Sequence, residues 1–154
     1  MPLPSVWLLA FVLTVAIELP CYALVLRRRL PRWQQLLALV LGLEIITHPA
    51  SWWAWGELVP IVPDETVRLL SIEAAVTVVE ALLVAAVLRR NSDSRRALVL
   101  GVGSSLLANS VSTAAGLVLR PLLVATSLYS VRLAFALLSV AFASLWVRTK
   151  QPPT

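Results

Sequence analysis

The sequence has few charged residues and almost no cysteine, histidine or methionine. Charged side chains make up 14% of its 154 residues, against about a quarter in an ordinary soluble domain. The single cysteine, Cys21, excludes an internal disulfide framework and a zinc site built from several cysteines. Disorder requires low hydrophobicity and high net charge, whereas 59% of these residues are hydrophobic and the mean hydropathy is +0.86. The composition therefore excludes a disordered chain, argues against a soluble domain and predicts an integral membrane protein.

Five runs of about twenty apolar residues predict membrane-spanning helices, because the hydrocarbon core is about 30 Å thick and a helix rises about 1.5 Å per residue. No basic residue precedes the first run, so we expect it to stay in the membrane rather than to be cleaved as a signal peptide. We predict an all-helical bundle of five transmembrane helices that forms a single domain over residues 1–150, followed by a frayed tail at 151–154. The expected spans are 5–26, 33–55, 67–88, 97–119 and 122–147.

The arginine clusters predict the direction in which these helices cross the membrane. Cytoplasmic loops carry an excess of Lys and Arg, and ten of the thirteen basic residues follow the first, third or fifth run. Short clusters between apolar runs do not form the basic face of a nucleic-acid-binding protein, so we expect no nucleic-acid partner. We expect the N-terminus outside and the C-terminus in the cytoplasm of a bacterium, with the chain in the inner, or plasma, membrane. The ten residues are Arg27, Arg28, Arg29, Arg32, Arg89, Arg90, Arg95, Arg96, Arg148 and Lys150.

Four glutamates lie inside the predicted spans, where charged side chains are rare because each costs about 2.5 to 3.5 kcal/mol to insert near the bilayer centre. Residues three, four or seven positions apart share one face of a helix, and this spacing places the glutamates on narrow polar stripes. We expect such stripes to face one another inside the bundle. The stripes are Thr14, Glu18, Cys21 and Tyr22 in the first run, Glu44, Thr47, His48 and Ser51 in the second, and Glu73, Thr77 and Glu80 in the third.

The rise per residue places most of these polar groups close to the bilayer midplane and the others about 6 to 7 Å toward the outside. Carboxylates crowded in a water-poor interior cannot all stay ionised unless they take up protons or a cation. We therefore predict an ion- or proton-binding site where the stripes meet. Its expected residues are Glu18, Glu44, His48 and Glu80, surrounded by Glu73, Thr77, Asn109 and Arg132.

A divalent metal ion is an alternative occupant of this site. His48 lies four residues after Glu44, and Glu80 would join them from the next helix. Imidazole and carboxylate together suit zinc, iron or manganese, whereas magnesium prefers oxygen ligands and water. The sequence alone leaves both occupants open, protons or a metal.

Small residues recur every three or four positions along the fourth run. Such a stripe lets two helix backbones approach closely in a membrane. We expect it to be a packing face, and it is also the candidate contact for a second copy of the chain or for a partner membrane protein. Its members are Gly101, Ser105, Ala108, Ser112 and Ala115.

Three functions fit these features. We favour cation- or proton-linked binding or transport. The first alternative is an intramembrane metal-dependent enzyme that acts on a lipid or isoprenoid, but the sequence contains no G-x-S-x-G or H-E-x-x-H motif, so we do not expect an enzyme. The second alternative is a non-catalytic assembly subunit whose buried charges pair with another membrane protein.

In one feature, Glu18 within the first span, the chain resembles the small multidrug-resistance exporters, whose first helix carries the exchanging carboxylate. The likeness covers residues 16–18 and their surroundings. Those exporters have four spans and lack the glutamates of the second and third runs, so the resemblance does not assign the chain to that family.

Overall fold

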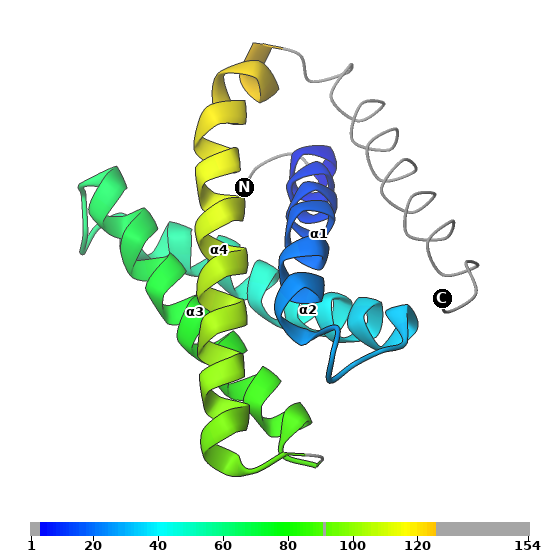
Figure 1. Ribbon diagram of the computed structural model, residues 1–154. Coiled ribbons are helices and arrows are strands. Elements are labelled where there is room, and N and C mark those ends of the chain that lie inside the picture. The colour runs from blue at the N-terminus through cyan, green and yellow to red at the C-terminus, as the bar shows by residue number, and fades with distance from the viewer. Residues whose placement is uncertain (1–3, 91, 126–154) are drawn as a thin grey trace.

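The structure, a computed structural model, describes residues 4–90 and 92–125. These residues form four α-helices, drawn in Figure 1, and each helix is long and apolar enough to cross a membrane. The expectation of an all-helical chain with membrane-spanning helices is confirmed at this level. The helices are α1 (Pro4–Leu26), α2 (Trp33–Leu58), α3 (Glu65–Leu88) and α4 (Ser94–Ala125).

The first three expected spans match α1, α2 and α3 to within three residues at each end. The fourth candidate span, Ser94–Leu119, ends at the expected residue. The helix itself continues through Arg120 and Pro121 to Ala125, where the expected spans leave a gap between 119 and 122. A proline removes one backbone hydrogen bond, and the helix has continued here in spite of that loss. Apart from its first four positions, the predicted fifth span, 122–147, lies outside the described residues, as do Arg132 and the tail at 151–154.

Aspartates mark the starts of two helices. The Asp64 side chain accepts a hydrogen bond of 2.9 Å from the backbone N–H of Val67, which caps α3. Asp93 precedes α4 and accepts from the backbone N–H groups of Arg95 and Arg96 at 2.9 and 3.2 Å. Side-chain oxygens satisfy N–H groups that have no partner within the first turn of a helix. These two aspartates therefore cap helices, whereas the glutamates inside the spans make other contacts.

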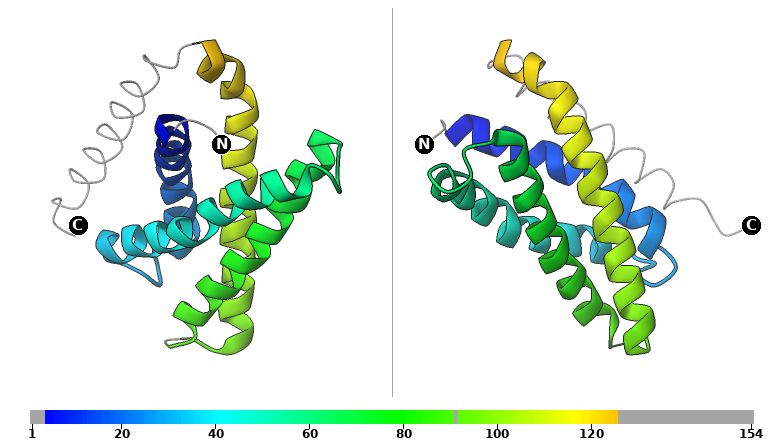
Figure 2. Two further views of the ribbon diagram at one scale, coloured as in Figure 1. Left: turned by 180° about the vertical axis from the view of Figure 1, so that it is seen from behind. Right: turned by 90° about the vertical axis from the view of Figure 1, so that its left-hand side faces the viewer.

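Helix α4 packs against α1 and α3, and α2 packs against the same two helices from another side. Figure 1 shows α4 in front, and Figure 2, which includes the view from behind, shows α2 crossing the others. Gly101 lets α4 approach α3 closely, since a Cβ at this position would meet the backbone oxygen of Ala81 and lie 3.2 Å from the backbone nitrogen of Ala85. The polar residues of all four helices can therefore meet in the middle of the bundle.

Apolar side chains cover much of the outside of these four helices. A water-soluble bundle would bury most of them, whereas lipid tails solvate them without cost. The exposed surface therefore fits a hydrocarbon environment. Examples from each helix are Leu24, Ile45, Trp53, Leu70, Val99 and Leu106.

Candidate functional site

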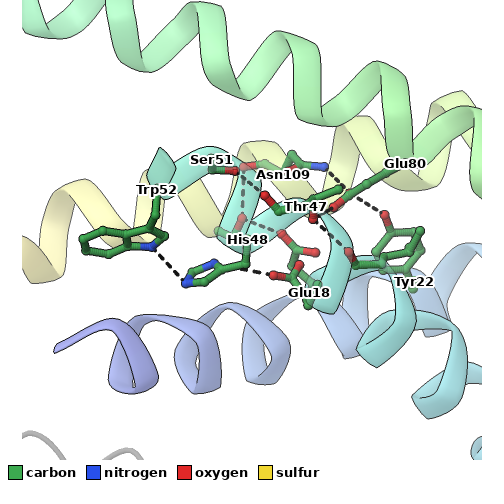
Figure 3. Close-up of polar contacts among 11 residues, drawn as sticks. Glu18, Tyr22, Thr47, His48, Ser51, Trp52, Glu80 and Asn109 are labelled. Atoms are coloured by element: carbon green, nitrogen blue, oxygen red, sulfur yellow. Dashed lines mark hydrogen bonds and ion pairs between the residues drawn. The ribbon is translucent and has the colours of Figure 1, made fainter. Parts of the chain in front are cut away.

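Glu80 of α3 stands at the centre of a buried hydrogen-bond network and is fully shielded from solvent. Its Oε2 accepts a hydrogen bond of 2.9 Å from the Tyr22 hydroxyl of α1 and one of 2.7 Å from Asn109 Nδ2 of α4. Its Oε1 lies 3.0 Å from Thr47 Oγ1 of α2. Figure 3 shows these three side chains converging on Glu80. One carboxyl group thus joins all four helices.

The donors around Glu80 leave room for one further proton. Thr47 Oγ1 lies 3.0 Å from Glu80 Oε1 and also 3.0 Å from the backbone oxygen of Leu43. A hydroxyl group has one hydrogen and donates fully to one acceptor at a time. With a proton on Oε1, Glu80 would donate to Thr47 while Thr47 donates to Leu43, and every contact would be a complete hydrogen bond. The network can therefore accommodate either a charged or a neutral Glu80.

Glu18 of α1 is the second buried acid and lacks a complete set of donors. It is 1% exposed, and its Oε1 accepts a hydrogen bond of 2.8 Å from the Ser112 hydroxyl of α4. Its Oε2 is buried and has no donor among the residues that the structure describes. A buried oxygen without a donor costs about 1 to 3 kcal/mol, and more when it is charged. This oxygen therefore indicates that a proton or a cation completes the site.

Glu44 of α2 brings a third carboxyl group to the same place. Glu18, Glu44 and Glu80 each offer an oxygen, and these oxygens lie within 4.8 Å of one another. None of the three residues is more than 2% exposed. Glu18 and Glu44 are close enough for a hydrogen bond between them once one of the two carries a proton. The stripes predicted from the sequence thus meet in the interior, and three acids from three helices form what we call the acidic cluster.

No arginine or lysine neutralises the acidic cluster among residues 7–90 and 92–119, whose side chains the structure describes. The basic side chain found beside the cluster is His48, whose Nδ1 lies 3.7 Å from Glu44 Oε2. Arg68 is also buried, but it donates to the backbone oxygen of Val62 at 2.8 Å and lies over the ring of Trp55 at 4.3 Å. Buried like charges without a counter-ion are strongly unfavourable. The cluster must therefore hold fewer than three negative charges or bind a positive one.

His48 occupies an aromatic enclosure beside the cluster. Its Nε2 accepts a hydrogen bond of 3.0 Å from the indole N–H of Trp52, visible in Figure 3. The rings of Trp7 and Phe11 each lie 5.5 Å from the His48 ring. A ring nitrogen that accepts an N–H bond carries no proton of its own, so the imidazole proton sits on Nδ1, which faces Glu44. His48 is thereby held as a neutral ring beside the cluster, with its Nδ1 3.7 Å from Glu44 Oε2 and so beyond hydrogen-bond distance.

The metal set expected from the sequence, Glu44, His48 and Glu80, stays a prediction, and the structure brings Glu18 beside its two glutamates. The group that could hold a metal consists of Glu18, Glu44 and Glu80, and His48 does not belong to it. The lone pair of His48 Nε2 accepts the hydrogen bond from Trp52, and Nδ1 carries the proton, so neither nitrogen is free to bind a metal. An all-oxygen set suits magnesium, calcium or manganese better than zinc.

The expected surrounding residues have different positions. Asn109 is buried and donates to Glu80 and to the backbone oxygen of Ser105. Glu73 is half-buried beside Thr113 of α4, outside the acidic cluster. Thr77 is half-buried, and no hydrogen bond with another described residue links it to the cluster. Arg132 lies outside the described residues. Of these four, Asn109 alone is seen to contact a clustered acid.

Four hydroxyl groups that the sequence analysis did not assign to the site hold it together. Tyr22 and Thr47 lie on the predicted stripes, and both contact Glu80. Ser105 lies 3.1 Å from the Tyr22 hydroxyl, and Ser112 donates to Glu18. Both serines also belong to the packing stripe predicted from the sequence. Their spacing of four and three residues from Asn109 was the available signal, because it places all three on one face of α4.

The small-residue stripe of α4 faces the inside of this chain. Gly101 contacts Ala81 of α3, and Ala108 is fully buried. Ser105 and Ser112 contact Tyr22 and Glu18 of α1. The stripe therefore serves packing and the acidic cluster within one copy of the protein.

The chain matches no protein-family model, no curated protein and no solved structure. Three carboxyl groups, a neutral imidazole and several hydroxyls in a buried space can exchange protons or ligate a small cation.

Proposed function

We propose that this protein binds protons or a small cation at Glu18, Glu44 and Glu80 and couples that binding to transport across the membrane. The observation that carries the proposal is the approach of three buried carboxyl groups to within 4.8 Å of one another without an arginine or lysine beside them among the described residues. The donor-free Oε2 of Glu18 supports it independently.

Proton binding and cation binding are two states of one site under this proposal. A cation that enters between the three oxygens replaces the proton that would otherwise keep like charges apart. Loading with a cation would release a proton, and unloading would take one up. This competition is the physical basis of proton-coupled exchange, and the all-oxygen ligand set favours a hard cation such as magnesium, calcium or manganese.

The proposal includes the finer topology expected from the sequence. In this proposal the protein has five spans, the last at 122–147, and lies in a bacterial inner membrane. Its N-terminus is outside and its C-terminus is in the cytoplasm. The positive-inside rule supports this direction, since arginines cluster after α1 and around the turn between α3 and α4. Labelling of single cysteines placed at 92 and 150 in a Cys21→Ser background would test it from either side of the membrane.

The decisive experiment measures the melting temperature of the purified protein in mild detergent while magnesium, calcium, manganese or zinc is titrated at several pH values. A ligand at a hundred times its Kd stabilises the folded state by about 2.7 kcal/mol. We expect one of these cations, or acidification, to raise the melting temperature of the wild type. Glu18→Gln, Glu44→Gln and Glu80→Gln should each abolish or strongly reduce the response.

The matched control is Glu57→Gln, which removes the same charge at an exposed position. It should leave the response unchanged. Circular dichroism of each variant confirms that its helices have formed. A cation and pH response that persists in all three cluster variants, or that Glu57→Gln removes equally, would overturn the proposal.

Transport itself is tested in proteoliposomes loaded with a pH-sensitive dye. Addition of the stabilising cation outside should move protons in the opposite direction in the wild type, and the Glu80→Gln protein should not support that movement. Equal proton fluxes in the two preparations would separate binding from transport and reject the transport half of the proposal.

A further inference from the structure

A groove lies between the end of α1 and the first turns of α4, away from the acidic cluster. Its volume is about 390 Å³, within the range of about 300 to 1,000 Å³ that small-molecule sites occupy. One part of its lining is apolar and the other is strongly basic. The lining residues are Leu24, Val25 and Leu100, together with Arg28, Arg29 and Arg96.

The arginines of this groove have no acidic partner in the described part of the chain. The close contact of a basic group with an acid that the structure shows there joins His48 and Glu44, and it involves none of these arginines. The nearest acid along α4, Asp93, directs its two oxygens to the backbone N–H groups of Arg95 and Arg96. Arginines that line one groove without a carboxylate partner offer a site for an anion, above all for phosphate, which arginine binds through two parallel hydrogen bonds.

The apolar side of the groove continues onto the outer surface of the bundle. Leu24 is 81% exposed, so no helix among the described residues covers it. A free phosphate would leave Leu24, Val25 and Leu100 without a partner. An anionic lipid fills both halves, since its phosphate can pair with the arginines while its acyl chain lies along the leucines and the valine.

We propose that this groove binds the headgroup of an anionic phospholipid, with Arg28, Arg29 and Arg96 around the phosphate. Basic pockets between transmembrane helices are suited to such headgroups. The bound lipid ties the turn after α1 to the start of α4, two segments separated by more than half of the described chain. The site is independent of the proposed cation site and of the direction in which the helices cross the membrane.

The test uses the full chain in detergent, titrated with phosphatidylglycerol or with phosphatidylcholine, and counts bound lipids by native mass spectrometry. We expect phosphatidylglycerol to bind tighter than phosphatidylcholine and to raise the melting temperature. Arg28→Gln and Arg96→Gln should each weaken phosphatidylglycerol binding about fivefold, the effect of one basic residue at an anionic headgroup. The double variant should lose more than tenfold.

Arg89→Gln and Arg90→Gln are matched controls, because both residues are exposed, cluster in the sequence with Arg96 and do not line the groove. They should change binding less than twofold. A further arm replaces the lipid with inorganic phosphate or glycerol phosphate, which should not reproduce the stabilisation. Equal binding of the two lipids, equal losses in groove and control variants, or full stabilisation by phosphate alone would each overturn the proposal.

Discussion

The hydroxyl of Tyr22 on α1 donates a buried hydrogen bond of 2.9 Å to Oε2 of Glu80 on α3. The same hydroxyl lies 3.1 Å from Ser105 Oγ of α4, so one phenol joins three helices at the acidic cluster. Tyr22 is fully buried, and its ring belongs to the apolar core. Tyr22 therefore takes part both in the hydrogen-bond network around Glu80 and in the apolar packing of the bundle.

Tyr22→Phe is expected to destabilise the protein by about 1 to 3 kcal/mol, because it leaves Glu80 and Ser105 with unfilled hydrogen-bonding capacity in the interior. Glu80→Gln keeps the shape of the side chain and changes the same contact. The two effects should therefore be non-additive, with a coupling of about 0.5 to 3 kcal/mol in a double-mutant cycle measured by unfolding in detergent. Strictly additive losses would show that the 2.9 Å contact contributes nothing to stability. Ser71→Ala, which removes an exposed hydroxyl bonded within its own helix, should have little effect.

Trp52→Phe should change the proton position on His48. The substitution keeps an aromatic ring but removes the indole N–H that donates to Nε2. His48 is the one histidine of the chain, so ¹⁵N NMR of protein labelled at histidine reports on this residue alone. We expect the wild type to show protonated Nδ1 and unprotonated Nε2, and the variant to show a population with protonated Nε2. Trp53→Phe at an exposed position should retain the wild-type spectrum. A wild-type spectrum dominated by protonated Nε2 would contradict the described tautomer.

Gly101→Ala should destabilise the bundle by about 1 to 3 kcal/mol, as overpacking in a tight interior does. The added Cβ would meet the backbone oxygen of Ala81, which cannot move without shifting α3. Gly103→Ala is the matched control two residues away, since a Cβ there meets nothing within 4 Å. It should be neutral or slightly stabilising, because alanine favours helix more than glycine does. Equal melting temperatures for the two variants would reject close packing of α4 on α3.

The sequence was sufficient to locate helices α1, α2 and α3 and the stripes on which Glu18, Glu44 and Glu80 lie. Length and apolar composition decide where a membrane helix runs, and the helical period decides which residues share a face. The pairing of stripes across helices depends on crossing geometry, which no single helix encodes. For that reason the sequence predicts only packing for Ser105 and Ser112. It also does not predict the hydrogen bond from the Trp52 indole to His48 Nε2. Helix α4 continues past the expected end of its span, through Arg120 and Pro121, where the sequence favoured a turn.

Under the proposed function, the acidic cluster holds a proton or a cation rather than three negative charges. Infrared spectroscopy of the protein at neutral pH, combined with elemental analysis of the same sample, measures both directly. Metal-free protein should show the band of a protonated carboxyl group, which Glu18→Gln or Glu44→Gln diminishes and Glu57→Gln leaves intact. Protein with about one bound cation per chain should lack that band. Fully ionised carboxylates in protein without a bound cation would contradict the account.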